Sequence, residues 1–157
     1  MTDAAIMALQ DNEILLNSVL IDLARSYLQY VCESWPWVSG EGLGIEQQIQ
    51  VIAARQRQAV SEIAELLTDR EHFVDFGTYP TEYTDMQFLS LQSALSRVLT
   101  SQHYLCQRLQ DAATSLEAAG DAQGAALLLN IESRQKDSTR SLTELNTELQ
   151  KTSPAFR

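Results

Sequence analysis

The sequence predicts an all-α fold, a four-helix bundle with one long connection between its second and third helices. Apolar residues recur every three to four positions in four long segments, which is the spacing of one buried helix face. No segment shows the alternation of a strand. At 157 residues the chain is long enough for one domain with a substantial core. We therefore expect a single domain over residues 1–157, with helices near 5–34, 45–69, 85–119 and 121–151.

The first helix is predicted from a stripe of apolar and aromatic residues, Leu16, Leu20, Leu23, Tyr27, Tyr30 and Val31. Pro36 ends it, because the residue before a proline disfavours the helical conformation. A glycine-rich turn then leads into the second helix. Its inward stripe comprises Ile49, Ile52, Ala59, Ile63, Leu66 and Leu67.

The third helix is expected to begin at Thr84 or Asp85, since either side chain can cap a helix N-terminus. Its stripe comprises Phe88, Leu91, Leu95, Val98, Leu99, Leu105, Cys106, Leu109 and Leu116. Gly120 breaks this helix, and Asp121 caps the fourth. The stripe of the fourth helix comprises Leu127, Leu128, Ile131, Leu142, Leu145 and Leu149.

The connection from Arg70 to Thr84 carries the topological information. Fully extended, about 15 residues span roughly 50 Å, whereas a helix of about 25 residues is roughly 37 Å long. The connection can therefore run the whole length of the bundle, which predicts parallel second and third helices. The other two connections are short, and short connections join antiparallel neighbours.

The charge balance excludes several classes of partner. The formal net charge is −10, whereas binding of nucleic acid or anionic lipid needs clustered lysine and arginine. No apolar run is long enough for a membrane span, and the N-terminus lacks the basic region of a signal peptide. We therefore expect a cytoplasmic protein that binds neither nucleic acid nor membrane. Its two cysteines, Cys32 and Cys106, are expected to be reduced helix residues.

Several short patterns, in their order along the chain, resemble the Dps family, the mini-ferritins. The first helix and its turn contain Leu16-Asn17, Leu20, Asp22, Tyr27, Trp35, Val38 and Gly40, similar to the family's L-N-x-x-L-x-D, Y and H-W-N-V-x-G. One insertion at Trp35-Pro36-Trp37-Val38 interrupts that match. Glu62-Ile63-Ala64-Glu65 resembles the family's E-I-A-E, and Gly120-Asp121 with Ala125 and Leu127-Leu128 resembles G-D-x-x-x-A-x-L-L. The resemblance implies a ferritin-like bundle with its long crossover, and self-association as a homodimer or a larger assembly.

The resemblance also implies where iron ligands would lie, and most of those positions carry another residue type. The family's five ligands fall on Ser34, Glu46, Gln50, Ser61 and Glu65. Glu65 is unchanged and Glu46 offers an oxygen ligand, but nineteen positions on one helix separate them by about 28 Å. They could share an ion only between subunits. The wider ferritin-like Glu-x-x-His reads Glu132-x-x-Gln135 here. We expect no cofactor, and at most a weakly held divalent cation.

Other polar and aromatic residues have plain structural interpretations. His103 is expected at the surface and His72 in the crossover, while Glu132 and Arg134 are expected to be surface charges. Gln92 and Gln102 are expected near the inward face of the third helix, where a buried amide needs partners. The aromatic residues of the two irregular segments either line a pocket or pin the crossover to the bundle, and we expect the second: Trp35, Trp37, Phe73, Phe76, Tyr79 and Tyr83.

Three functional hypotheses follow from the sequence. The preferred one is a non-catalytic ferritin-like protein that acts through oligomerisation or partner binding and is not an enzyme. The second is a metal-binding or iron-oxidising protein with a rearranged inter-subunit site that uses Glu46 and Glu65. The third is a small-molecule sensor with a pocket under the aromatic crossover. No motif identifies a protein or small-molecule partner.

Overall fold

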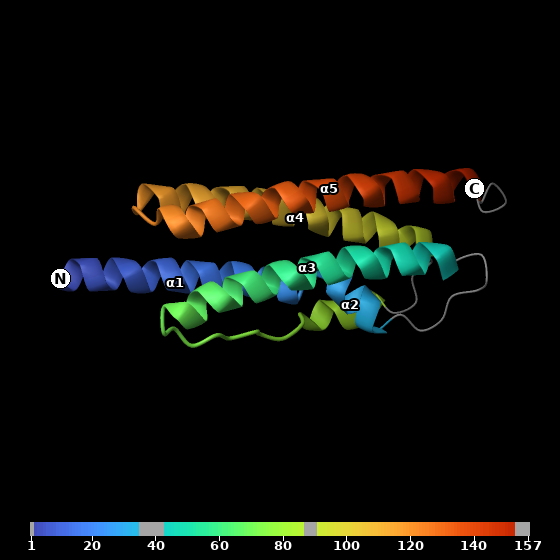
Figure 1. Ribbon diagram of the computed structural model, residues 1–157. Coiled ribbons are helices and arrows are strands. Elements are labelled where there is room, and N and C mark those ends of the chain that lie inside the picture. Colours follow the sequence, from blue (N-terminus) through green and yellow to red (C-terminus); the bar gives the residue numbers. More distant parts are fainter. Residues whose placement is uncertain (1, 35–42, 87–90, 153–157) are drawn as a thin grey trace.

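The computed structural model describes residues 2–34, 43–86 and 91–152, and within these ranges the chain is helical and has no strand. The elements follow in the order α1 (Asp3–Ala24), α2 (Tyr27–Ser34), α3 (Leu43–Asp69), the 3-10 helix η1 (Thr81–Met86), α4 (Leu91–Ala118) and α5 (Ala122–Thr152). α1 and α2 succeed one another in the first position of the bundle, and α3, α4 and α5 occupy the other three (Figure 1). The predicted all-α four-helix bundle is confirmed.

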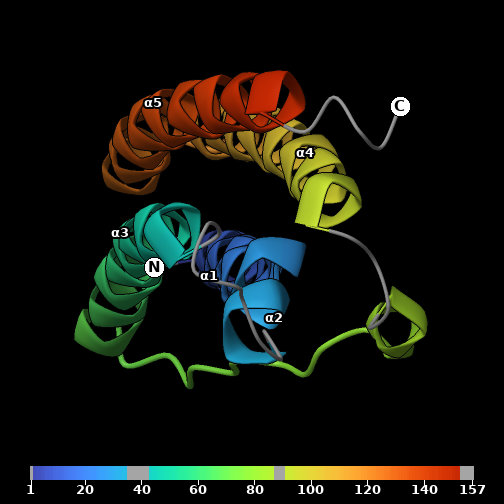
Figure 2. The ribbon, with the colours of Figure 1, turned by 90° about the vertical axis from the view of Figure 1, so that its right-hand side faces the viewer.

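The long connection has the predicted topological effect. In Figure 1 the chain runs from right to left in both α3 and α4, and from left to right in α1 and α5. α3 and α4 are therefore parallel, and the crossover between α3 and η1 returns along the bundle. Figure 2 shows this crossover on the side of α1 and α2 that faces away from α4 and α5. None of the described helices is both long enough and apolar enough to span a membrane.

Two apolar clusters fill the interior. The first joins α1 to α3, α4 and α5, and includes Leu20, Ile63, Leu109 and Leu128, all fully buried. The second joins α2 to the other parts of the same three helices, and includes Leu28, Ala53, Leu95 and Leu142. Each fully buried leucine contributes about 1.5–3 kcal/mol relative to an exposed one. These residues lie on the predicted stripes, or extend them, so helical periodicity identified the core.

The predicted first helix, 5–34, is not continuous. It breaks at Arg25 and Ser26, between the end of α1 and the start of α2. The Ser26 hydroxyl accepts a hydrogen bond from the amide of Gln29 at 3.4 Å and donates one to Oε1 of Gln56 at 2.7 Å. Serine favours such breaks because its side chain competes with the backbone for hydrogen bonds. The break thus places the buried Ser26 hydroxyl toward the neighbouring α3.

The predicted start of the third helix is also wrong. Thr84 and Asp85 do not cap an α-helix but lie within η1, and α4 as described begins at Leu91. The Thr84 hydroxyl donates to the carbonyl of Thr81 at 2.7 Å, so it stabilises its own 3-10 turn. Phe88, predicted as the first residue of the stripe, lies outside the described residues.

Polar contacts hold the crossover against α1. Asn17 Nδ2 donates to the carbonyl of Asp75 at 3.1 Å, and the Asp75 amide donates to Asn17 Oδ1 at 3.0 Å. Nε of Arg25 donates to the carbonyls of Phe76 and Gly77 at 3.0 and 3.1 Å. Gly77 has φ +64°, and a Cβ there would lie 2.7 Å from Cγ2 of Ile21. Only glycine permits this close approach.

Aromatic packing completes the attachment of the crossover. The Tyr83 ring packs against Tyr27 with ring centroids 5.3 Å apart, and Tyr79 packs against Tyr30 at 5.5 Å. Tyr79 and Tyr83 therefore pin the crossover as predicted. The prediction is wrong for Phe73 and Phe76, which are 83% and 47% exposed. Trp35 and Trp37, predicted to act in the same way, lie outside the described residues.

α3 ends in a left-handed turn at a residue that is not glycine. Glu71 has φ 57°, and the amide of His72 donates to the carbonyl of Leu67 at 2.9 Å. A second hydrogen bond joins the Glu71 amide to the carbonyl of Thr68 at 2.9 Å, which completes a Schellman motif. α4 ends in the same motif with Gly120 at φ 82°. The two helices thus share one terminal geometry but differ in the residue that adopts it.

We expect Glu71→Gly to raise the free energy of unfolding by about 0.5–1 kcal/mol, because glycine relieves the left-handed strain. The Glu71 side chain is exposed, so little packing is lost. Gly120→Ala is the matched reverse change, since a Cβ at Gly120 meets nothing within 4 Å and only backbone strain is added. Urea unfolding should move in opposite directions for the two variants. A destabilised Glu71→Gly would show that its carboxylate matters more than its backbone.

Candidate functional site

One glutamine from each of the four positions of the bundle lies at its centre. Gln29 comes from α2, Gln56 from α3, Gln102 from α4 and Gln135 from α5. Their exposed fractions are 2%, 0%, 0% and 2%, so all four are withdrawn from water. We call this group the glutamine network. It lies between the two apolar clusters and forms a polar layer across the bundle.

Gln56 is the hub of the glutamine network. Its Nε2 donates to Oε1 of Gln102 at 3.0 Å and to Oε1 of Gln135 at 3.2 Å. Its Oε1 accepts a hydrogen bond from Nε2 of Gln29 at 2.8 Å. Nε2 of Gln102 also donates to Oε1 of Gln135 at 3.0 Å. Direct hydrogen bonds therefore connect all four helical positions through buried side chains.

Neighbouring groups that can only donate or only accept determine the direction of the hydrogen bonds in the glutamine network. Nε2 of Gln29 donates to the carbonyl of Ala53 at 2.9 Å, and that carbonyl can only accept. Arg57, which can only donate, gives a hydrogen bond to Oε1 of Gln29 at 3.0 Å. The Ser26 hydroxyl donates to Gln56 Oε1 at 2.7 Å. The orientation of the Gln29 amide is thus determined, and that of Gln56 follows from it.

The local sequence explains why these amides point inward. Gln56 continues the stripe of Ile52, Ala59 and Ile63 at helical spacing, and Gln102 continues that of Val98 and Leu105. The apolar neighbours determine which face of each helix is buried, and the glutamine is carried inward with them. A buried amide is tolerated only when it finds partners, and here the four supply them to one another.

One buried carboxylate on α5 forms an ion pair with a lysine of the same helix. Glu132, three positions before Gln135, is 6% exposed, and its Oε1 lies 2.8 Å from Nζ of Lys136. The prediction that Glu132 is a surface charge is therefore wrong, because the residue lies on the inward face of α5. Arg134 forms its ion pair with Glu62 of α3 at 2.7 Å. The four glutamine side chains themselves carry no formal charge.

The residues at the centre do not fit an iron site. Iron(II) oxidation in such bundles uses several carboxylate and imidazole ligands with open coordination positions. Here the converging donors are neutral amides, and their oxygens are already occupied by hydrogen bonds. Across residues 2–34, 43–86 and 91–152, no group of three or more histidine, cysteine, aspartate or glutamate residues could hold a metal ion. The donor set thus differs from that of a ferroxidase.

The two predicted metal ligands do not meet within the chain. Glu46 is half-buried in the first turn of α3, and Glu65 is exposed near the end of the same helix. A site that uses both carboxylates therefore requires two copies of the chain.

Hydrogen bonds to backbone carbonyls engage the other three family positions, and that of Gln50 joins α3 to α2. Ser34 donates to the carbonyl of Tyr30, Gln50 to that of Cys32 and Ser61 to that of Arg57.

The remaining predicted polar residues have mixed outcomes. His103 is exposed on α4 as expected, and His72 lies half-buried in the crossover. Gln102 is buried as predicted, but Gln92 is exposed, so that prediction is wrong. Gln29 and Gln56 were not predicted from the sequence. Gln56 could have been found as a polar residue where the stripe of Ile52 and Ala59 should continue, whereas Gln29 lies off the predicted stripe and gave no such signal.

Both cysteines are free and half-buried, as expected for helix residues that form no bridge. Burial raises the pKa of the Cys32 thiol to about 11. Burial likewise raises the pKa of the Cys106 thiol, whose Sγ lies 3.9 Å from the Thr139 hydroxyl. Both thiols are therefore protonated at neutral pH, and the protonated form is a poor nucleophile and metal ligand.

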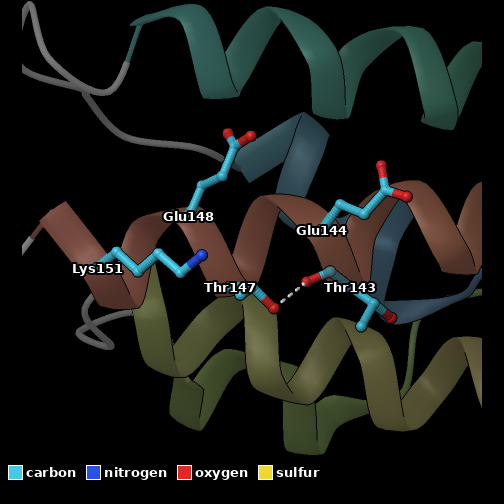
Figure 3. A pocket seen from close by; sticks show the side chains of 5 residues that line it. All are labelled: Thr143, Glu144, Thr147, Glu148 and Lys151. Atoms are coloured by element: carbon cyan, nitrogen blue, oxygen red, sulfur yellow. Dashed lines mark hydrogen bonds between the residues drawn. The ribbon is translucent and has the colours of Figure 1, made fainter.

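A surface hollow near the end of α5 is a weaker candidate. Figure 3 shows its lining, which comes from this one helix: Thr143, Glu144, Thr147, Glu148 and Lys151. Binding sites usually bring polar groups together within an apolar cleft. This hollow has no lining residue from a second element, and it does not lie under the crossover. We assign no function to it.

Comparison with known proteins agrees with this architecture. The sequence model of the ferritin-like domain family matches residues 14–152 of this chain. The fold is similar to the X-ray structure of Dps from Thermosynechococcus elongatus, with a TM-score of 0.74 over 91% of this chain and 94% of that chain. The two sequences are 13% identical, so the likeness concerns the fold. Among curated proteins, no significant match was found.

Proposed function

Because the chain belongs to the ferritin-like domain family, we propose that it is a non-catalytic member, which acts through self-association or by binding a partner. The observation that carries this proposal is the glutamine network. Four neutral amides occupy the centre of the bundle and satisfy one another by hydrogen bonds. Such donors neither hold iron firmly nor move a proton at neutral pH. The bundle then serves as a scaffold, and its surface carries the function.

The surface supports association. Several large apolar side chains are exposed on α1, α3, the crossover, α4 and α5: Ile6, Met7, Ile14, Val51, Phe73, Phe76, Tyr104 and Leu129. Scattered exposed residues are normal, but Phe73 and Phe76 both belong to the crossover, which Asn17 of α1 holds in place. We propose a homodimer or larger assembly as the working form. A cytoplasmic location belongs to the same proposal, since free thiols fit a reducing compartment.

The inter-subunit metal site is the alternative. Glu46 and Glu65 lie at opposite ends of α3, so only a second copy could bring one to the other. Two carboxylates with a few waters would suit a hard cation such as Mg²⁺ and would bind it weakly. The sensor hypothesis has less support, because Tyr27 and Tyr30 pack against the two tyrosines of the crossover.

Two measurements test the proposal. Sedimentation at micromolar protein should show a species heavier than the 17.6 kDa chain, and a single monomer would contradict self-association. Iron(II) oxidation in air should run no faster than in a protein-free control. Fast oxidation that Glu65→Ala abolishes would establish the alternative site. Glu117→Ala, which removes an exposed carboxylate from α4, is the matched control.

We also expect no binding of DNA. The net charge is −10, and residues 1–13 contain no lysine or arginine that could contact phosphates. A gel-shift assay at low salt should leave the DNA free. Retention that weakens steeply as salt is added would overturn this expectation, because that dependence reports phosphate contacts.

A further inference from the structure

We infer that the glutamine network stands at the ligand positions of a di-metal centre, with neutral amides in place of the carboxylate and imidazole donors. The bundle would then retain the arrangement of a metal site in a form that holds no metal. This inference goes beyond the proposed function, because it concerns what the central side chains replace. It holds whether or not copies of the chain associate.

The spacing of the inward residues matches that of a di-metal bundle, although the Ala53 side chain offers no ligand atom. Such bundles place a single glutamate on each of two helices and a Glu-x-x-His pair on each of the other two. Here α2 and α4 each contribute one inward glutamine, Gln29 and Gln102. α3 and α5 each contribute a glutamine whose neighbour three positions earlier is also buried. These two pairs are Ala53 with Gln56, and Glu132 with Gln135.

The distances agree with this assignment. The four amide groups come from separate helices, and the Nε2 to Oε1 distances of their hydrogen bonds are 2.8–3.2 Å. Metal ligands from four helices must converge in the same way on one small volume. The only carboxylate in the set is Glu132, and Lys136 lies 2.8 Å from it. The convergence is therefore present, while the imidazole nitrogens and every carboxylate except Glu132 are missing.

Glutamine and glutamate have nearly the same shape, which makes the inference testable. A glutamate at Gln102 can stay protonated in the metal-free bundle, where it keeps an acceptor oxygen and one donor. A divalent cation would displace that proton, because ligation requires the deprotonated carboxylate. A histidine at Gln135 would supply a nitrogen that amides lack. The exchange of donors should thus convert a hydrogen-bonded layer into a metal site.

The experiment compares four proteins by titration with Co²⁺, followed by visible absorption and by the melting temperature. These are the unchanged protein, Gln102→Glu/Gln135→His, a quadruple variant that adds Gln29→Glu and Gln56→His, and the exposed control Gln58→Glu/Gln110→His. The two central variants should bind Co²⁺ at least roughly 100-fold more tightly than the control and should melt at a higher temperature with metal than without it. The unchanged protein should show no central binding.

Each other outcome is decisive. If both central variants are folded and bind Co²⁺ no better than the control, the inference is wrong. Failure of both to fold with Co²⁺ present would also overturn it, since a ligand-shaped centre must accept ligands when the metal is supplied. The double variant guards against simple misfolding, because it retains Gln29 and Gln56 with their edge contacts. Central binding of Co²⁺ by the unchanged protein would instead defeat the proposed non-catalytic function.

Discussion

Gln56→Leu is expected to lower the free energy of unfolding by about 3 kcal/mol or more, because the substitution removes the hub of the glutamine network. Leucine leaves the Ser26 hydroxyl and Oε1 of Gln102 without their buried partners. Each buried polar group left unsatisfied costs about 1–3 kcal/mol. Gln29 keeps its hydrogen bond to the carbonyl of Ala53, so the loss of stability comes mainly from Ser26 and Gln102.

Urea unfolding followed by circular dichroism measures this effect. Gln58→Leu is the matched control, since it is the same substitution on the same helix at an exposed position. We expect that control to change stability by no more than about 0.5 kcal/mol. Equal stabilities of Gln56→Leu and the control would mean that the hydrogen bonds of the network contribute nothing net.

The second large effect is expected at Asp121, where two helices are tied together. Its two carboxylate oxygens accept hydrogen bonds from Arg70 at 2.7 and 2.9 Å, and Oδ1 also accepts one from the amide of Gly124 at 2.9 Å. Asp121 therefore caps α5, as predicted, and holds its start to the end of α3. The side chains of Arg70 and Asp121 are 17% and 7% exposed, so screening by water is limited. Asp121→Ala should lower the free energy of unfolding by about 3 kcal/mol.

The same pair gives a pH dependence with a defined sign. The hydrogen bond from Arg70 is the main reason that the pKa of Asp121 lies below its ordinary value. A lowered pKa in the folded state means that the ionised form stabilises the fold. This contribution is complete above the unfolded pKa of about 3.9 and disappears as the pH falls through the lower folded pKa.

The stability difference between the wild type and Asp121→Asn should therefore be constant near neutral pH and shrink below about pH 4. Asp137→Asn is the control, because that carboxylate pairs with Arg140 at the surface, where both side chains are about 70% exposed. Its effect should be small at every pH. A difference for Asp121→Asn that persists undiminished at pH 2 would show that hydrogen bonding alone, without charge, explains the contact.

The sequence predicted the bundle because its signals are long and periodic. The stripes through Leu20, Ile63, Leu109 and Leu128 identify the buried faces, and the length of the connection determines that α3 and α4 are parallel. The break at Ser26 could not be predicted in this way, because the apolar stripe continues across it from Leu23 to Tyr27. Periodicity reports which face is buried, whereas the break depends on a hydrogen bond to another helix.

The central site was only partly predictable. The sequence predicts Gln102 near the inward face and distinguishes Gln135 as the last residue of Glu-x-x-Gln. Gln56 lies on the inward stripe of its helix but was not singled out, and Gln29 lies off its stripe. Gln92 is predicted inward by the same reasoning and is exposed, because helical spacing alone does not distinguish neighbouring faces of α4. What unites the four glutamines is their common level in the bundle. That level depends on the register between helices, which no single stripe contains.

The crossover also gives the molecule an order of assembly. α4 and α5 are joined by three residues, so their contacts are local and can form early. The hydrogen bonds between Asn17 and Asp75 join positions 58 residues apart, and a loop of that length must close before they can form. We expect docking of the crossover to be a late step in folding and its release an early step in unfolding. Amide exchange at Asp75 should then report a sub-global opening in which the four helices are still packed.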